Sequence, residues 1–162
     1  MRRTGAFTLV ELILVMALLC VILGVAAPSL SRSMRQRNLT QEAARLLAAT
    51  EYARDEAISR GVPMAVWIDV ANGQFGIREM PGYDAATPRD KEFTLLDGLH
   101  FDIQQGMASS GQAQAAEFGA DGTLDPSSQQ TLRIVDRTNA AIEIAQTSDA
   151  SEYQIVDDTK AQ

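Results

Sequence analysis

The spacing of apolar positions changes along the chain and divides it into three stretches. Residues 7–27 are apolar almost without interruption, and the only ionisable side chains among them are Glu11 and Cys20. Residues 28–61 repeat apolar or small side chains every three or four positions, which is the period of one helix face. From residue 64 onward, short alternating segments rich in β-branched and aromatic side chains are typical of strands.

The first stretch is long enough to cross a membrane as a helix. At about 1.5 Å per residue, residues 7–27 form a helix of roughly 30 Å, which matches the hydrocarbon thickness of a bilayer. Arg2 and Arg3 precede this stretch, and basic residues tend to stay on the cytoplasmic side. We therefore expect a cytoplasmic N-terminus and a single pass that places the rest of the chain outside.

The second stretch predicts an amphipathic helix over residues 28–61. Its apolar or small side chains recur at alternating steps of four and three, at Leu39, Ala43, Leu46, Thr50, Ala53 and Ala57. We expect this face to pack against a sheet, and the helix to continue from the apolar segment across a kink near Pro28. Gly61, with Pro63 two positions later, predicts the helix end.

The third stretch, residues 62–162, predicts a β-rich head. Its clearest element is a hairpin, in which residues 64–70 and 74–79 flank a turn at Asn72 and Gly73. Further strands are predicted at 93–96, 99–104, 131–136, 141–145 and 152–156, with loops at 80–92, 104–114 and 118–130. A helix followed by short antiparallel strands is an α+β fold.

Charge is unevenly distributed along the chain. The formal net charge is -7, and residues 61–162 carry six basic groups against 16 acids. Because nucleic-acid affinity comes largely from neutralising phosphates with Lys and Arg, this head is not expected to bind nucleic acid. The Arg-rich residues 32–37 can contact lipid headgroups or acids of other subunits, or simply be solvated.

The sequence offers no constellation for catalysis. It has one cysteine, Cys20, and one histidine, His100, so it can form neither an intramolecular disulfide nor a Cys–His nucleophile pair. The acids Asp121, Asp125 and Asp136 lack the spacing of an EF-hand, and Asp121-Gly122 is explained as a turn. We expect no catalytic, cofactor or metal site, and therefore no enzyme.

Three interpretations of the N-terminal segment remain open from hydropathy alone. A secretory signal peptide would be cut after the small residues Val25, Ala26 and Ala27, but Pro28 would then follow the scissile bond. A plain signal anchor would place Glu11 near the membrane interface, where a carboxylate costs less than at the centre. The third interpretation treats Glu11 as functional.

The third interpretation rests on the motif "GAFTLVEL" before an unbroken apolar helix. The motif resembles the class III signal of type IV pilins and type II secretion pseudopilins. This resemblance implies that residues 1–6 are a leader removed by prepilin peptidase, that Phe7 becomes the N-methylated first residue, and that Glu11 and Pro28 are residues 5 and 22 of the mature chain. Both spacings agree on cleavage between Ala6 and Phe7.

The residue before the cut departs from the family pattern. The family usually has Gly there, whereas this chain has Ala6, with Gly5 one position earlier. Cleavage after Gly5 is the alternative, but it would make Glu11 the sixth residue.

The head also resembles a particular branch of this family. The residues Arg54, Glu56, Ala57, Arg60 and Gly61 at the helix end, the following hairpin, and "FGADGT" at residues 118–123 are similar to the minor pseudopilin H and minor pilin FimT family (GspH/FimT). The resemblance implies a pilin-like fold, with residues 7–27 as transmembrane and filament-core helix, in a minor pseudopilin of the type II secretion pseudopilus. The alternative is a minor type IV pilin that acts in pilus assembly or DNA uptake.

The same resemblance implies partners and a role for Glu11. The expected partners are prepilin peptidase, other major and minor pseudopilins, the inner-membrane assembly platform and exported proteins. The expected location is the bacterial inner membrane, with the head in the periplasm. A carboxylate and an amine in lipid each carry a large penalty unless paired. We therefore expect Glu11 to pair with the Phe7 amine of a neighbouring subunit, or with the amine of its own chain.

Overall fold

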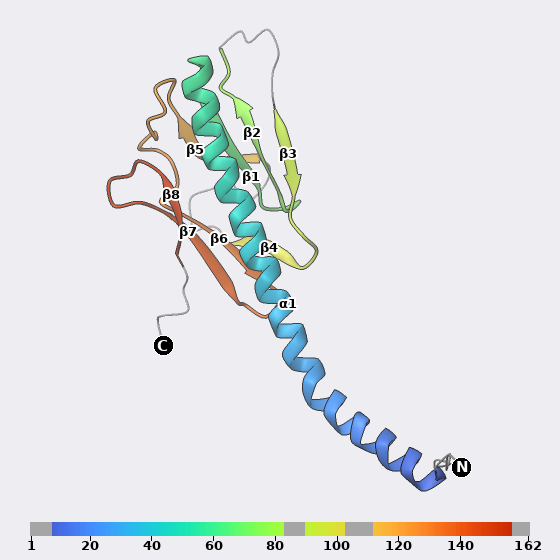
Figure 1. The fold of residues 1–162 in the computed structure, drawn as a ribbon. Coiled ribbons are helices and arrows are strands. Elements are labelled where there is room, and N and C mark those ends of the chain that lie inside the picture. Colours follow the sequence, from blue (N-terminus) through green and yellow to red (C-terminus); the bar gives the residue numbers. More distant parts are fainter. Residues whose placement is uncertain (1–7, 83–89, 103–111, 157–162) are drawn as a thin grey trace, which may run out of the picture. The chain divides into compact units, whose positions relative to one another are not determined.

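The computed structural model describes residues 8–82, 90–102 and 112–156, and it leaves the side chains of residues 25–32 undescribed. One helix, α1 (Leu9–Arg60), runs through both predicted helical stretches (Figure 1). The chain divides into two units, the first comprising the first 37 residues and the second, the head, beginning at Asn38.

The head contains two four-stranded antiparallel sheets. The first has the order β3-β2-β1-β5 and the second the order β4-β6-β7-β8. The strands are β1 (Met64–Asp69), β2 (Gln74–Glu79), β3 (Lys91–Thr94), β4 (Leu99–Asp102), β5 (Gln112–Phe118), β6 (Thr131–Asp136), β7 (Ala141–Gln146) and β8 (Tyr153–Val156). The α+β prediction and the hairpin β1–β2 are therefore confirmed.

The sequence prediction missed strand β5. Residues 104–114 were predicted as a loop, and no strand was predicted at 112–118. This segment is rich in alanine and lacks β-branched side chains, so its local preference for a strand is weak. It becomes a strand by pairing with β1, with a register shift between Val66 and Trp67.

Strand β3 begins earlier than predicted. The prediction placed a strand at 93–96 and assigned Lys91 and Glu92 to a loop. In the structure β3 pairs with β2 from Ile77↔Lys91 to Gln74↔Thr94. The extent of this strand is set by the neighbouring strand, a constraint that local hydropathy does not contain.

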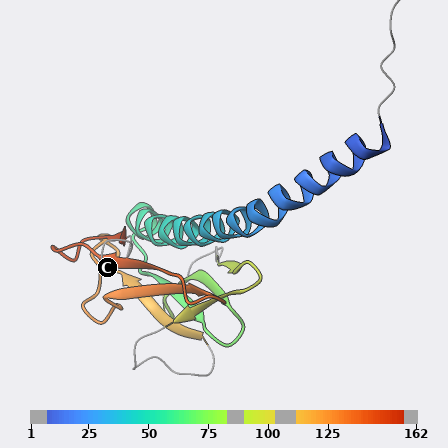
Figure 2. The same ribbon diagram turned by 90° about the horizontal axis from the view of Figure 1, so that it is seen from below.

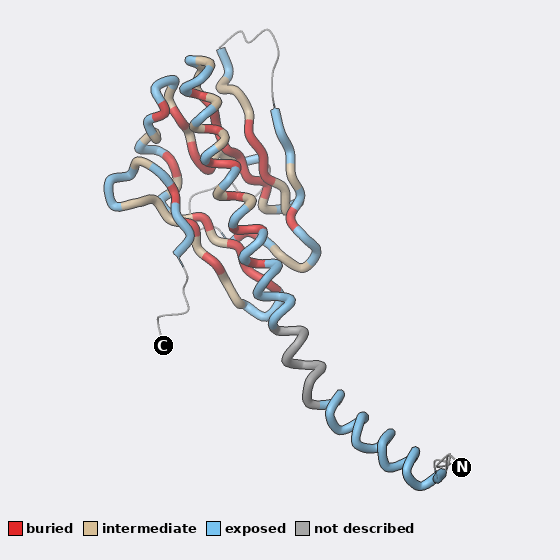
Figure 3. Tube along the Cα trace, in the orientation of Figure 1, coloured by how far each residue is buried: buried red, intermediate tan, exposed pale blue. Residues whose placement is uncertain are grey.

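One hydrophobic core joins the helix to both sheets. All six side chains of the predicted helix face are buried, including Leu39, Leu46 and Thr50. Within the head, Figures 1 and 2 show α1 lying along one side of the strands, and Figure 3 shows buried residues on both the helix and the strands. Phe75, Phe118 and Ile144 extend this core through both sheets. The predicted packing face is therefore confirmed.

The helix ends as predicted. Its last residue is Arg60, and Gly61 has a φ of 64°. This left-handed conformation favours glycine, which carries no Cβ.

Candidate assembly site

The start of α1 is capped by a local hydrogen bond. The backbone N–H of Glu11 donates to Oγ1 of Thr8 at 3.3 Å, which satisfies one of the donors that every helix N-terminus leaves free. Thr8 and Glu11 have the Thr-x-x-Glu spacing of a capping box, a signal that the sequence prediction overlooked. The Glu11 side chain is exposed in the first turn, where the helix dipole stabilises a negative charge.

The helix residues from Leu9 to Leu23 present apolar side chains outward. Large hydrophobic residues from Leu9 to Leu23 are 43–74% exposed. Contiguous exposed apolar surface of this kind marks an interaction with lipid or protein. Of the helical residues whose side chains are described, none forms a stretch that combines the length and hydropathy needed to cross a bilayer.

The predicted processing residues are only partly covered by the structure. Gly5, Ala6 and Phe7 lie outside the described residues, as does the side chain of Pro28. Cleavage, methylation and the pairing of Glu11 stay predictions.

Arg35 and Arg37 lie in the first unit of the chain and are exposed.

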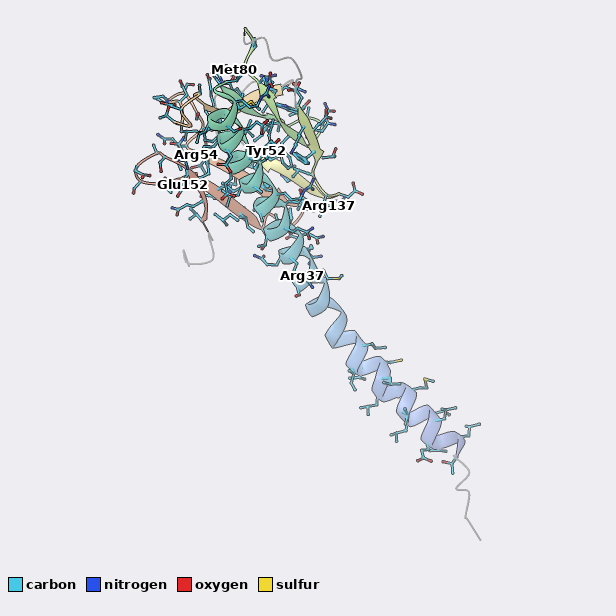
Figure 4. All side chains as sticks on the ribbon, turned by 45° about the horizontal axis from the view of Figure 1, so that its top comes forward. Arg37, Tyr52, Arg54, Met80, Arg137 and Glu152 are labelled. Carbon is cyan, nitrogen blue, oxygen red and sulfur yellow. The ribbon has the colours of Figure 1, made fainter. Side chains whose placement is uncertain are left out.

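The helix end carries ionic contacts to both sheets. Arg60 forms an ion pair with Glu79 of β2 and approaches Glu56 of its own helix at 3.8 Å. Arg54 lies 3.6 Å from Glu152, just before β8 (Figure 4). Two of the residues singled out from the sequence, Arg54 and Arg60, therefore connect α1 to different sheets.

The "FGADGT" segment forms a turn that packs on the same helix end. Oδ1 of Asp121 accepts hydrogen bonds from the backbone N–H and the hydroxyl of Thr123. These bonds lower the pKa of Asp121 below its usual value. Gly122 is buried, and a Cβ there would lie 2.5 Å from Cδ1 of Ile58. The turn therefore packs closely against the end of helix α1.

The residues that the sequence analysis considered for catalysis or metal binding either lie apart from one another or form hydrogen bonds that hold turns of the fold. His100 is exposed on β4. Asp125 accepts a hydrogen bond from the backbone N–H of Ser127, and Asp136 accepts bonds from Thr138 and Ala140. No group of three or more His, Cys, Asp or Glu side chains that could hold a metal ion occurs among the described residues. The residues of this candidate site are therefore suited to packing against, and pairing with, other protein surfaces.

Two family models match the chain. The model for the prokaryotic N-terminal methylation motif matches residues 1–27. The model for type II transport protein GspH matches residues 42–156, which is most of the chain. A search of curated proteins finds no match.

Solved structures of pilin-like subunits share the fold. The minor pseudopilin EpsH from the type 2 secretion system of Vibrio cholerae matches with a TM-score of 0.55 and 16% identity, over 74% of this chain and 97% of that one. The type IV minor pilin FimU of Pseudomonas aeruginosa matches with a TM-score of 0.56 and 20% identity, over 79% of this chain and 95% of that one. At these identities the likeness establishes the pilin-like fold. With a helix feeding a two-sheet head, a methylation motif at its start and a family match over most of its length, the chain belongs to the GspH family of type II transport proteins.

Proposed function

We propose that this chain is a minor pseudopilin, a structural subunit of the type II secretion pseudopilus that takes part in protein secretion across the outer membrane. The observation that carries the proposal is the combination of two matches, to the methylation motif at residues 1–27 and to GspH at residues 42–156. Helix α1 begins in the first matched range and ends in the second. The fold likeness to EpsH supports it.

The proposed maturation begins at the leader. Prepilin peptidase cuts between Ala6 and Phe7, with cleavage after Gly5 as the alternative, and the amine of Phe7 is methylated. Residues 7–27 hold the chain in the inner membrane, with the N-terminus cytoplasmic and the head periplasmic. The exposed apolar side chains from Leu9 to Leu23 support this arrangement, because they have lipid or neighbouring helices as their natural surroundings.

Glu11 directs assembly by pairing with an amine. When the helix of an incoming subunit enters the filament, its Glu11 carboxylate meets the Phe7 amine of a neighbour, and each charge removes the other's desolvation penalty. The Glu11 side chain is exposed. Its carboxylate is therefore accessible to another subunit, which supports this role. Other pseudopilins and the inner-membrane platform are the partners in this step.

Mass spectrometry of the chain purified from membranes tests the maturation. We expect a mature chain that starts at N-methyl-Phe7. A chain that starts at Ala6 identifies the alternative bond, whereas a start at Pro28 or an intact Met1 contradicts the proposal.

A substitution at Glu11 tests the assembly role. Glu11→Val is expected to leave cleavage intact and to abolish incorporation into the filament, measured by co-purification with the other pseudopilins. Glu51→Val removes an exposed carboxylate from the same helix within the head and is the matched control. Normal incorporation of Glu11→Val would refute the pairing role.

A minor type IV pilin is the second candidate, and the fold likeness to FimU favours it. Within this candidate, the acidic head disfavours a role in DNA uptake. Deleting the gene separates the two systems: loss of exported proteins from the medium, with surface pili unaffected, supports the secretion role, whereas loss of pili with normal secretion supports the pilin.

A further inference from the structure

An apolar hollow lies between α1 and the edge strand β3. It has a volume of about 280 Å³ and is lined by Arg45, Ala48, Ala49, Tyr52, Ile77, Lys91 and Phe93. We refer to these residues as the α1/β3 hollow. All of them belong to the head, and the hollow is separate from the Arg54 and Arg60 ion pairs.

Small side chains on the helix create the hollow. Arg45, Ala48, Ala49 and Tyr52 follow the i, i+3, i+4, i+7 spacing of a single helix face. Because the two alanines are short, they leave space where a longer side chain would reach toward β3. In the described part of the head, β3 pairs only with β2 and ends its sheet, so no further strand covers this side.

The rim of the hollow carries positive charge. Nζ of Lys91 lies 3.5 Å from the centroid of the Tyr52 ring, and no carboxylate of the described residues forms an ion pair with it. Arg45 lies over the Phe93 ring at 5.5 Å and pairs with the buried Glu42. Lys91 is therefore an exposed cation beside an apolar floor.

The size and charge of the hollow limit its occupant. Its volume is just below the roughly 300 Å³ at which small-molecule sites begin, so one or two side chains fill it better than a cofactor does. An apolar side chain would cover the alanine floor, and a neighbouring carboxylate would match Lys91. Charge complementarity of this kind fixes the register of two protein surfaces.

We propose that the α1/β3 hollow is the docking site for a neighbouring pilin-like subunit. That subunit inserts an apolar side chain between α1 and β3, and an acidic residue of the same segment pairs with Lys91. This inference rests on the proposed function and names the surface through which the head recognises its neighbour.

Site-specific crosslinking in the native bacterium tests the contact. The photoreactive residue p-benzoylphenylalanine replaces Ala48 in the full-length chain, and mass spectrometry identifies the crosslinked peptide. Ala44, an exposed alanine one helical turn earlier and outside the hollow, is the matched control position. We expect a crosslink from position 48, absent from position 44, to a pilin-like subunit whose peptide contains an acidic residue next to an apolar one.

Substitutions then separate filling from charge. Ala48→Leu fills the hollow, and we expect it to lower co-purification of the crosslinked subunit at least about tenfold, as for loss of an interface hot spot. Lys91→Glu is expected to lower it several-fold, and replacing the acidic residue of the partner by Lys should restore binding. Arg137→Glu makes the same charge change at an exposed position outside the hollow and should have no effect.

Processing is measured in the same samples so that two failures can be told apart. A chain that starts at Phe7 but crosslinks equally from positions 44 and 48, only to an exported protein, or not at all, overturns the docking site and leaves the proposed function standing. A chain with an unprocessed leader overturns the proposed function itself. Equal co-purification of Lys91→Glu and Arg137→Glu would also refute the docking site.

Discussion

Gly122 lies where the turn of residues 119–123 meets helix α1. Its φ of 78° is in the left-handed region, and its missing Cβ leaves room for Ile58. Conformation and close approach therefore both require glycine here. Gly61 provides a useful contrast, because it has a φ of 64° but, apart from its chain neighbours, no described residue within 4 Å of the position that a Cβ would take.

We expect Gly122→Ala to destabilise the head by about 2–4 kcal/mol, through left-handed strain and overpacking together. Gly61→Ala should cost about 1–2 kcal/mol, because it has the strain alone. Adding Ile58→Ala should recover part of the loss in Gly122→Ala and none in Gly61→Ala. Urea unfolding of the four variants measures these free energies, and equal effects of Ile58→Ala in both backgrounds would contradict the contact.

At the scale of elements, two arginines connect α1 to the sheets in different environments. Arg60 and its partner Glu79 have side chains that are only 23% and 9% exposed. Arg54 and Glu152 are 38% and 59% exposed. Solvent screens the second pair, whereas removing Arg60 leaves a nearly buried carboxylate on β2 without its cation.

Arg60→Met should therefore lower the free energy of unfolding by about 2 kcal/mol, and Arg54→Met by less than about 1 kcal/mol. In the double variant with Glu79→Gln, much of the Arg60→Met loss should disappear, because the carboxylate on β2 is then no longer left without its cation. Chemical denaturation at low and high salt checks both statements. Similar losses for the two arginine variants would contradict the difference in burial.

At the scale of the whole molecule, the core begins at Leu39, two residues after the boundary between the two units. Every helical side chain that the structure describes as buried lies at or beyond this residue. Among the described residues, the first unit contributes none of this core. We therefore expect the head to fold without it.

A fragment of residues 33–162 is expected to unfold cooperatively. A fragment of residues 47–162 lacks Leu39 and Leu46, each worth about 1.5–3 kcal/mol when buried, and should lose most of the stability of a small domain. Thermal unfolding followed by circular dichroism compares the two. Equal midpoints would show that the helix residues before 47 add nothing to the core.

Acid should destabilise the head through several turn aspartates at once. Side-chain hydrogen bonds from Asn72, Thr123, Ser127 and Thr147 lower the pKa values of Asp69, Asp121, Asp125 and Asp149 below 3.8. A lowered pKa in the folded state means that the stabilisation is complete above the unfolded value and is lost as the pH falls through the folded value.

We therefore expect the unfolding midpoint to be nearly constant from neutral pH down to about pH 5 and to fall below about pH 4. Asp121→Asn should reduce stability at neutral pH and approach the unmodified head in acid. Asp97→Asn, the same change at an exposed residue between β3 and β4, is the control. A loss for Asp121→Asn that does not change with pH would refute the ionic contribution.

Local patterns in the sequence determined much of this architecture. The face containing Leu39, Leu46 and Thr50 was predictable because a helix repeats every few residues, and the β1–β2 hairpin was predictable because its turn and alternation lie within one short window. The motif around Glu11 indicated the family for the same reason, since its spacing is read along the chain. Thr8 could have been added from its capping-box spacing.

Only the tertiary structure decided which distant segments meet. The alanine-rich β5 is a strand because it pairs with β1, which lies about 50 residues earlier in the chain. The division into two sheets follows from pairings of this kind. The same holds for Gly122 against Ile58, for Arg60 beside Glu79, and for the α1/β3 hollow. Each depends on contacts between residues far apart in the chain, and the period and propensity of a short segment carry no information about its distant neighbours.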